Sequence, residues 1–222
     1  MKRAFKTIAS TILFAALSTA AQAVTFDFAA LGGPDVSSFS QTSDGITVTV
    51  TAGTFGNINT APSVIDFDTR MIDPLGQGLG VDGSNDNSPQ LDGRGANDVL
   101  VFTFSQAVRI DQILFGNVND NGNDNFTFGV VNGTAFDRLV PALGQREGPA
   151  VEPIVTLSSV LAGNASPVSL AFGIGAIQNN DNFSIAGLEV TAVPVPASLP
   201  LLAGALGFAA FASRRRKSKA AA

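Results

Sequence analysis

Short strand-like runs, separated by Gly, Asn, Asp and Pro, restrict the fold of this 222-residue chain more than any other feature. Residues 46–51 alternate apolar residues with threonine, a period of two that is typical of a strand with one buried face. Similar runs occupy residues 99–104, 108–115, 125–131, 153–157, 168–174 and 182–191, with a further edge strand at residues 25–28. No window before Ser198 shows sustained helical periodicity, so the chain is expected to be all-β.

The spacing of these runs predicts eight to ten strands in an antiparallel β-sandwich of jelly-roll type. Residues 105–107 are expected to form a turn between two of the strands. Residues 24–192 are long enough to bury one core, which predicts a single domain. The chain has 17 Phe and no Trp or Tyr, and the phenylalanines are expected to face that core.

The N-terminus has the three parts of a secretory signal peptide. Lys2, Arg3 and Lys6 are basic, residues 8–17 are mostly apolar, and Ala21 and Ala23 form an A-x-A cleavage signal. We expect signal peptidase to remove residues 1–23, with an uncleaved N-terminal anchor as the alternative.

The C-terminal segment, residues 193–222, has the composition of a membrane-directed signal. It consists of a proline motif, an apolar run at residues 199–212 and a basic cluster, in that order. The motif is Val193, Pro194, Val195, Pro196 and Ala197, and the basic stop is Arg214, Arg215, Arg216 and Lys217. A helix over residues 198–213 would be about 24 Å long, short for a hydrocarbon core of about 30 Å. The positive-inside rule places the basic stop in the cytoplasm, so this separate hydrophobic helix is expected to hold the precursor in the membrane.

This three-part tail resembles the PEP-CTERM sorting signals of Gram-negative bacteria. It is most similar to the VPLPA-type variant, with Val195 where that variant commonly has Leu, whereas the commonest form has Glu between the prolines. The resemblance covers residues 193–219. It implies recognition by an exosortase, a membrane-embedded cysteine transpeptidase. It also implies an inner-membrane precursor that becomes a protein of the cell surface or the extracellular polysaccharide matrix.

Charge and composition exclude several classes of function. Residues 24–192 contain all 18 acidic residues and only five arginines, which leaves a formal charge of −13 and disfavours nucleic acid. The chain has no His and no Cys, which removes His-dependent catalytic triads, the common zinc sites and disulfides. We therefore expect no enzymatic activity. The alternative is a secreted hydrolase of extracellular polysaccharide that uses two aspartates, although no spacing identifies a pair.

Calcium is the best candidate for a ligand. Asp82, Asp86, Asp92 and Asp98 lie within 17 residues together with Asn85, Asn87 and Asn97. Ca²⁺ prefers six to eight hard oxygen ligands, which such a segment offers. A second cluster contains Asp120, Asn121, Asn123 and Asp124. The alternative is that these residues serve turn geometry and solvation. Carbohydrate is the other candidate ligand, disfavoured by the absence of Trp and Tyr.

One sequence pattern occurs twice at an offset of 57 residues. Phe115-Gly116 is followed by Asn123-Asp124-Asn125-Phe126, and Phe172-Gly173 is followed by Asn180-Asp181-Asn182-Phe183. The pattern predicts two similar hairpins at one end of the domain. Chance similarity in an Asn-rich chain is the alternative.

Overall fold

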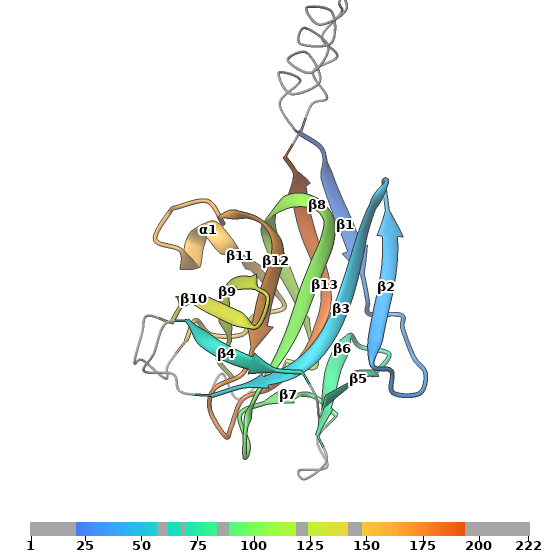
Figure 1. Cartoon of the computed structure of the whole chain (residues 1–222), viewed down its shortest axis with the longest axis vertical. Helices are drawn as coiled ribbons and strands as arrows, with labels where there is room; N and C mark the ends of the chain where they lie inside the picture. Colours follow the sequence, from blue (N-terminus) through green and yellow to red (C-terminus); the bar gives the residue numbers. More distant parts are fainter. Residues whose placement is uncertain are drawn as a thin grey trace, which may run out of the picture. The chain divides into compact units, whose positions relative to one another are not determined.

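The computed structural model describes residues 21–56, 62–67, 70–83, 89–118, 124–141 and 148–193. Within this part of the chain the fold is all-β, and every strand pairing is antiparallel (Figure 1). The described residues belong to one compact unit, Ala21–Val193. Residues 1–20 and the predicted C-terminal helix lie outside the described residues. Among those that are described, no helix is long and apolar enough to cross a membrane.

Thirteen strands and one helical turn make up the described structure, more strands than the eight to ten expected. The elements are β1 Ala23–Asp27, β2 Ser38–Ser43, β3 Ile46–Phe55, β4 Ser63–Asp66, β5 Arg70–Pro74, β6 Leu79–Gly83, β7 Leu91–Asp92, β8 Asn97–Gly116, β9 Thr127–Asn132, β10 Ala135–Val140, β11 Ile154–Thr156, α1 Leu157–Val160, β12 Val168–Gly175 and β13 Asn182–Ala192.

Six of the strands close into a ring. β8 pairs with β3 and β12, β12 with β9, β9 with β10, β10 with β4, and β4 with β3. Ring strands supply most of a small hydrophobic cluster that includes Phe55, Ile65, Val101 and Phe136. The rings of Phe55 and Phe136 meet edge to face with centroids 5.3 Å apart. Gly173 makes room for Phe136, since a Cβ at Gly173 would lie 2.7 Å from a ring carbon of Phe136.

The long strand β8 corrects one expectation. Residues 105–107 are not a turn between two strands but part of the single strand Asn97–Gly116. Pairing with β12 jumps there, from Ser169 opposite Val108 to Ala171 opposite Thr103. The Ser105 hydroxyl accepts the Thr47 N–H at 3.0 Å. Local composition resembles a turn, but hydrogen bonds to neighbouring strands keep this segment extended.

β8 joins the ring to the rest of the sheet. Its first half pairs with β3, and its second half pairs with β13. Residues 98–102 are all buried, because Leu100 and Phe102 belong to the main cluster while Val99 and Val101 belong to the small one. A run buried on both faces loses the apolar–polar alternation that otherwise identifies a strand.

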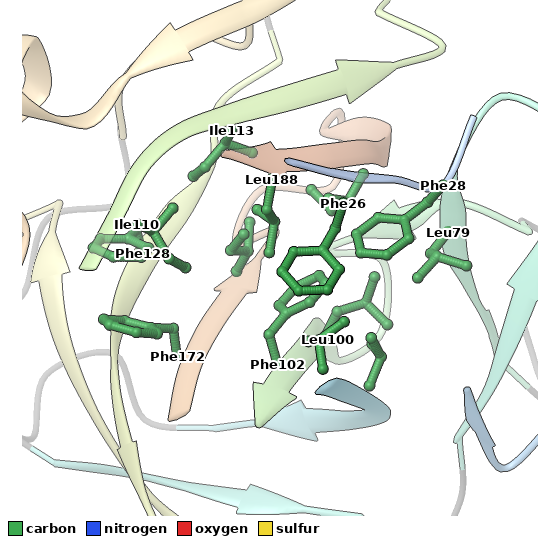
Figure 2. Close-up of a cluster of buried hydrophobic side chains, with 14 of the residues drawn as sticks. Phe26, Phe28, Leu79, Leu100, Phe102, Ile110, Ile113, Phe128, Phe172 and Leu188 are labelled. Carbon is green, nitrogen blue, oxygen red and sulfur yellow. The ribbon is translucent and has the colours of Figure 1, made fainter. Parts of the chain in front are cut away.

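The main hydrophobic cluster contains side chains from many strands, including β1, β3, β8, β12 and β13. Phe26 and Phe28 from the β1 end of the chain point toward Phe102 of β8 and Leu188 of β13 (Figure 2). In the described residues eleven phenylalanines are buried, which confirms the expectation that phenylalanines form the core. Burial of such side chains contributes about 1.5–3 kcal/mol each to the free energy of folding.

The strands that the sequence pattern missed are short or polar. β2 and β10 alternate weakly, and β4, β5, β6 and β7 have five residues or fewer. Of the expected strands, residues 25–28 correspond to β1, which pairs with β13 and with no other strand among the described residues. The expected run at residues 153–157 shortens to β11, because Leu157 begins the helical turn α1.

Candidate functional site: two pairs of buried aspartates

Four aspartates in the described chain are buried: Asp92, Asp98, Asp124 and Asp181. A buried carboxylate is costly unless hydrogen bonds or opposite charge compensate it. These four side chains are therefore the best candidates for a functional site. They form two pairs, each compensated in a different way.

The first pair comes from the repeated pattern. The two copies are not hairpins, because β8 does not pair with β9 and β12 does not pair with β13. Instead the copies interleave: β8 of the first pairs with β13 of the second, and β9 of the first pairs with β12 of the second. In the resulting strand order β9-β12-β8-β13, the first strands of the two copies are central and the second strands flank them. Exchanging the two copies therefore only reverses the order.

Asp124 and Asp181 bond reciprocally across this arrangement. The Asp181 carboxylate accepts the backbone N–H of Asn125 at 3.0 Å, and the Asp124 carboxylate accepts the backbone N–H of Asn182 at 3.1 Å. Each aspartate thus holds the residue that follows the other one. We call Asp124, Asn125, Asp181 and Asn182 the aspartate clasp.

Asp181 also holds two backbone groups outside the clasp. Its second carboxylate oxygen also accepts the N–H groups of Ile177 at 3.0 Å and Gln178 at 2.7 Å. Burial raises the pKa of Asp181, and the charge of Asp124 raises it further. The three backbone hydrogen bonds lower that pKa, but they do not offset burial. The proton affinity of Asp181 is therefore above that of an ordinary aspartate.

Aromatic residues of both copies contact one another next to the clasp. Phe115 contacts Phe126 of its own copy and Phe183 of the other, with ring centroids 5.0 and 5.3 Å apart. Phe126 and Phe183 directly follow the asparagines of the clasp. The aromatic contacts, like the clasp, therefore join residues of the two copies of the repeated pattern.

The second pair is Asp92 and Asp98, both in the segment for which calcium was predicted. The backbone N–H of Asp92 donates to the Asp98 carboxylate at 3.3 Å. Arg70 on β5 forms an ion pair with Asp98 at 3.3 Å. The side chains of Arg70 and Asp98 are 9% and 1% exposed, so this ion pair is largely shielded from bulk water. Asp92 in turn accepts the Arg94 N–H at 2.8 Å.

The other predicted ligands have different surroundings. Asp82 lies on β6, where its charge and that of Asp35 act on Asp73. Burial is the main cause of the raised pKa of Asp73, and these two charges add to it. Asn97 donates its side-chain amide to the Phe55 carbonyl at 3.2 Å.

Part of the predicted calcium segment, Asn85, Asp86 and Asn87, lies outside the described residues. The same is true of Asp120, Asn121 and Asn123 of the second cluster. Among the residues with described positions, no group of three or more acidic side chains is placed to hold a metal ion.

The predicted processing signals adjoin the two ends of the described unit. Ala23 is the first residue of β1 and pairs with Thr191 of β13, and Ala21 lies two residues before it. Val193 follows the end of β13, and its N–H donates to the Ala107 carbonyl at 3.2 Å. Pro194, Val195, Pro196, Ala197 and the basic stop Arg214, Arg215, Arg216 and Lys217 lie outside the described residues.

Two residues of the site were missed in the sequence. Asp181 could have been found from the repeated Asn-Asp-Asn-Phe pattern, which marks both clasp aspartates. Nothing local identifies Arg70 as the partner of Asp98, since 28 positions separate them and strands β6 and β7 intervene. No family model, curated protein or solved structure matches the chain.

Proposed function

We propose that the chain is an exported, non-catalytic protein of the cell surface or extracellular matrix of a Gram-negative bacterium. Signal peptidase would cut after Ala23, and an exosortase would process the motif that begins at Val193. The extent of the folded unit supports this most directly. The unit runs from Ala21 to Val193, so both signals adjoin its ends.

The strand pairing also supports a jelly-roll type of β-sandwich as the extracellular domain. Strands distant in sequence alternate in the sheet, as β9-β12-β8-β13 does, and Greek-key folds have such connections. A domain of this type needs no ligand to fold. It would occupy the extracellular layer as a scaffold, with an excess of negative charge that keeps it soluble.

Intact-mass measurement of protein extracted from the native cell surface tests the processing. The expected chain begins at Val24 and lacks Arg214–Ala222. Replacing Pro194→Ala with Pro196→Ala is expected to leave precursor in the inner membrane, whereas Pro34→Ala, at an exposed loop position, is expected to change nothing. Recovery of the full-length chain from the surface would contradict the proposal.

Calcium and extracellular polysaccharide are the proposed ligands. A glycan array probed with the surface-extracted protein, with Ca²⁺ or with chelator, tests both. Because Asp92 is buried and hydrogen-bonded, the informative variant for calcium is Asp82→Asn with Asp86→Asn. Equal melting temperatures in millimolar Ca²⁺ and in chelator would show that these loops bind no calcium.

A secreted hydrolase is the second candidate function. It is favoured by one observation, the adjacency of Asp124 to Asp181, whose pKa is raised as expected of a general acid. Against it, the two residues are only 4% and 1% exposed, which leaves no room for a substrate at the carboxylates. Release of reducing sugar from matrix polysaccharide by the native chain, lost in Asp181→Asn, would establish the hydrolase instead.

A further inference from the structure

The two processing positions lie on neighbouring strands. Ala23 pairs with Thr191, and the N–H of Ala192 donates to the Gln22 carbonyl at 3.2 Å. The start of β1 and the end of β13 lie at the same end of the domain (Figure 1). The last residues before the sorting motif are therefore held by residues that belong to the predicted signal peptide.

β8 holds the other edge of the same segment. Thr191 and Ala192 pair with Arg109 and Val108, and the Val193 N–H donates to the Ala107 carbonyl at 3.2 Å. Val193 is the first residue of the sorting motif, so no linker separates the motif from the sheet. In the precursor, the end of β13 lies between two hydrogen-bonded neighbours.

We propose that removal of the signal peptide loosens the end of β13 and thereby makes cleavage at the N-terminus a precondition for processing at the C-terminus. This inference depends on the proposed function. Hydrolysis of the Ala23–Val24 peptide bond by water leaves a carboxylate on Ala23 and an ammonium group on Val24. Gln22 and Ala23 then leave with the signal peptide, and Ala192 loses the carbonyl that accepts its N–H.

The rest of β1 is anchored and stays in place after the cut. Val24 pairs with Val190 and Phe26 with Leu188, and both β1 side chains are buried. The domain remains folded, and only the segment from Thr191 onward acquires a free edge. An enzyme that binds its substrate as an extended strand needs such an edge, because the main-chain groups of the substrate must be available for pairing.

Amide hydrogen exchange measures the loosening directly. Two chains with Pro194→Ala and Pro196→Ala, which keep the C-terminal segment, are compared in detergent. One is cut normally after Ala23, and the other carries Ala23→Leu, which blocks the small-residue cleavage site. The Ala192 amide is expected to exchange about tenfold faster in the cut chain, the effect of one backbone hydrogen bond. The Val193 amide is expected to be unchanged, and equal exchange of Ala192 in both chains would overturn the proposal.

Pulse–chase labelling in the native host tests the order of processing. With the sorting motif intact, Ala23→Leu is expected to retain the C-terminal segment. Adding Gly187→Ala is expected to restore its removal, because a Cβ at Gly187 would lie 2.6 Å from the Phe26 carbonyl oxygen and would push β1 from β13. The matched control is Gly129→Ala on β9, which places a Cβ 2.2 Å from the Asp137 carbonyl oxygen of β10 and does not affect the pairing of β1 with β13. This control is expected not to restore removal of the C-terminal segment.

The outcomes separate this inference from the proposed function. A wild-type chain that is cut after Ala23 but keeps its C-terminal segment would overturn the proposed exosortase processing, while the exchange of Ala192 still decides whether Gln22 holds the end of β13. A wild-type chain that loses both ends, together with an Ala23→Leu chain that loses its C-terminal segment at the wild-type rate, would overturn only the coupling.

Discussion

Two pairs of buried aspartates in one domain are compensated by different means. Asp98 has a guanidinium beside it, that of Arg70, at 3.3 Å. Asp181 faces a second carboxylate instead, that of Asp124, and its stabilising partners are three backbone N–H groups. At Asp98 charge is compensated by opposite charge, whereas at the clasp charge is compensated only in part, by oriented backbone N–H dipoles.

The difference predicts how each pair responds to change. Removing one partner of an ion pair that is largely shielded from water is strongly destabilising, because the other charge stays buried. Asp181 can relieve its burial by taking up a proton, for which its raised pKa is favourable. Arg70 and Asp98 are therefore expected to be sensitive to substitution, and the clasp to be sensitive to pH.

The largest effect is expected for Arg70→Met. Removing the guanidinium leaves Asp98 buried without its charge partner, which is expected to lower the free energy of unfolding by about 3–5 kcal/mol. Urea unfolding of the processed protein measures this. The matched control is Arg109→Met, which breaks the ion pair between Arg109 and Asp111. The side chains of Arg109 and Asp111 are 38% and 28% exposed. That change is expected to cost about 1 kcal/mol or less, and equal losses in the two variants would show that burial does not distinguish the two ion pairs.

A smaller effect is expected for Asp181→Ala. It leaves three backbone N–H groups without their carboxylate, at a cost of about 2 kcal/mol after the relief of burying the charge. If contacts among the neighbouring phenylalanines were the main support of this region, thermal unfolding of the variant would match that of the wild type.

Asp124→Ala sharpens the contrast within the clasp. Its carboxylate accepts the N–H of Asn182, and loss of that hydrogen bond is expected to cost about 1 kcal/mol in the same unfolding assay. A loss larger than that of Asp181→Ala would mean that Asp124 is the main support of the clasp.

The pH dependence is expected to be the smallest effect. Because the pKa of Asp181 is raised on folding, the folded protein binds the proton more tightly than the unfolded chain. Stability should therefore rise as the pH falls from neutral toward about 4, the ordinary range of aspartate. Asp124→Asn removes the neighbouring charge and is expected to reduce this slope without abolishing it, since burial is the main cause. Urea unfolding between neutral pH and about pH 4 measures the slope, with the exposed Asp137→Asn as the control; an unchanged slope in Asp124→Asn would exclude coupling within the clasp.

The local pattern of the sequence determined the class of fold and most of the long strands. Alternation identified β3, and similar strand-like runs identified both halves of β8, as well as β12 and β13. It could not show that residues 105–107 continue a strand, because their hydrogen bonds come from residues far away, such as Thr47. The short strands β4 to β7 were missed because partners, and not their own composition, make them strands.

The sequence also showed that one pattern occurs twice, but only the tertiary structure decided what the repeat does. A hairpin and an interleaved pair have the same local signature, and the choice between them depends on which strands meet in the sheet. The same holds for the aspartates. Composition placed Asp92 and Asp98 in an acidic segment, whereas folding brought Arg70 to Asp98 and Asp124 to Asp181. Periodicity along the chain is a local property, but compensation of a buried charge depends on contacts between distant residues, which exist only in the folded domain.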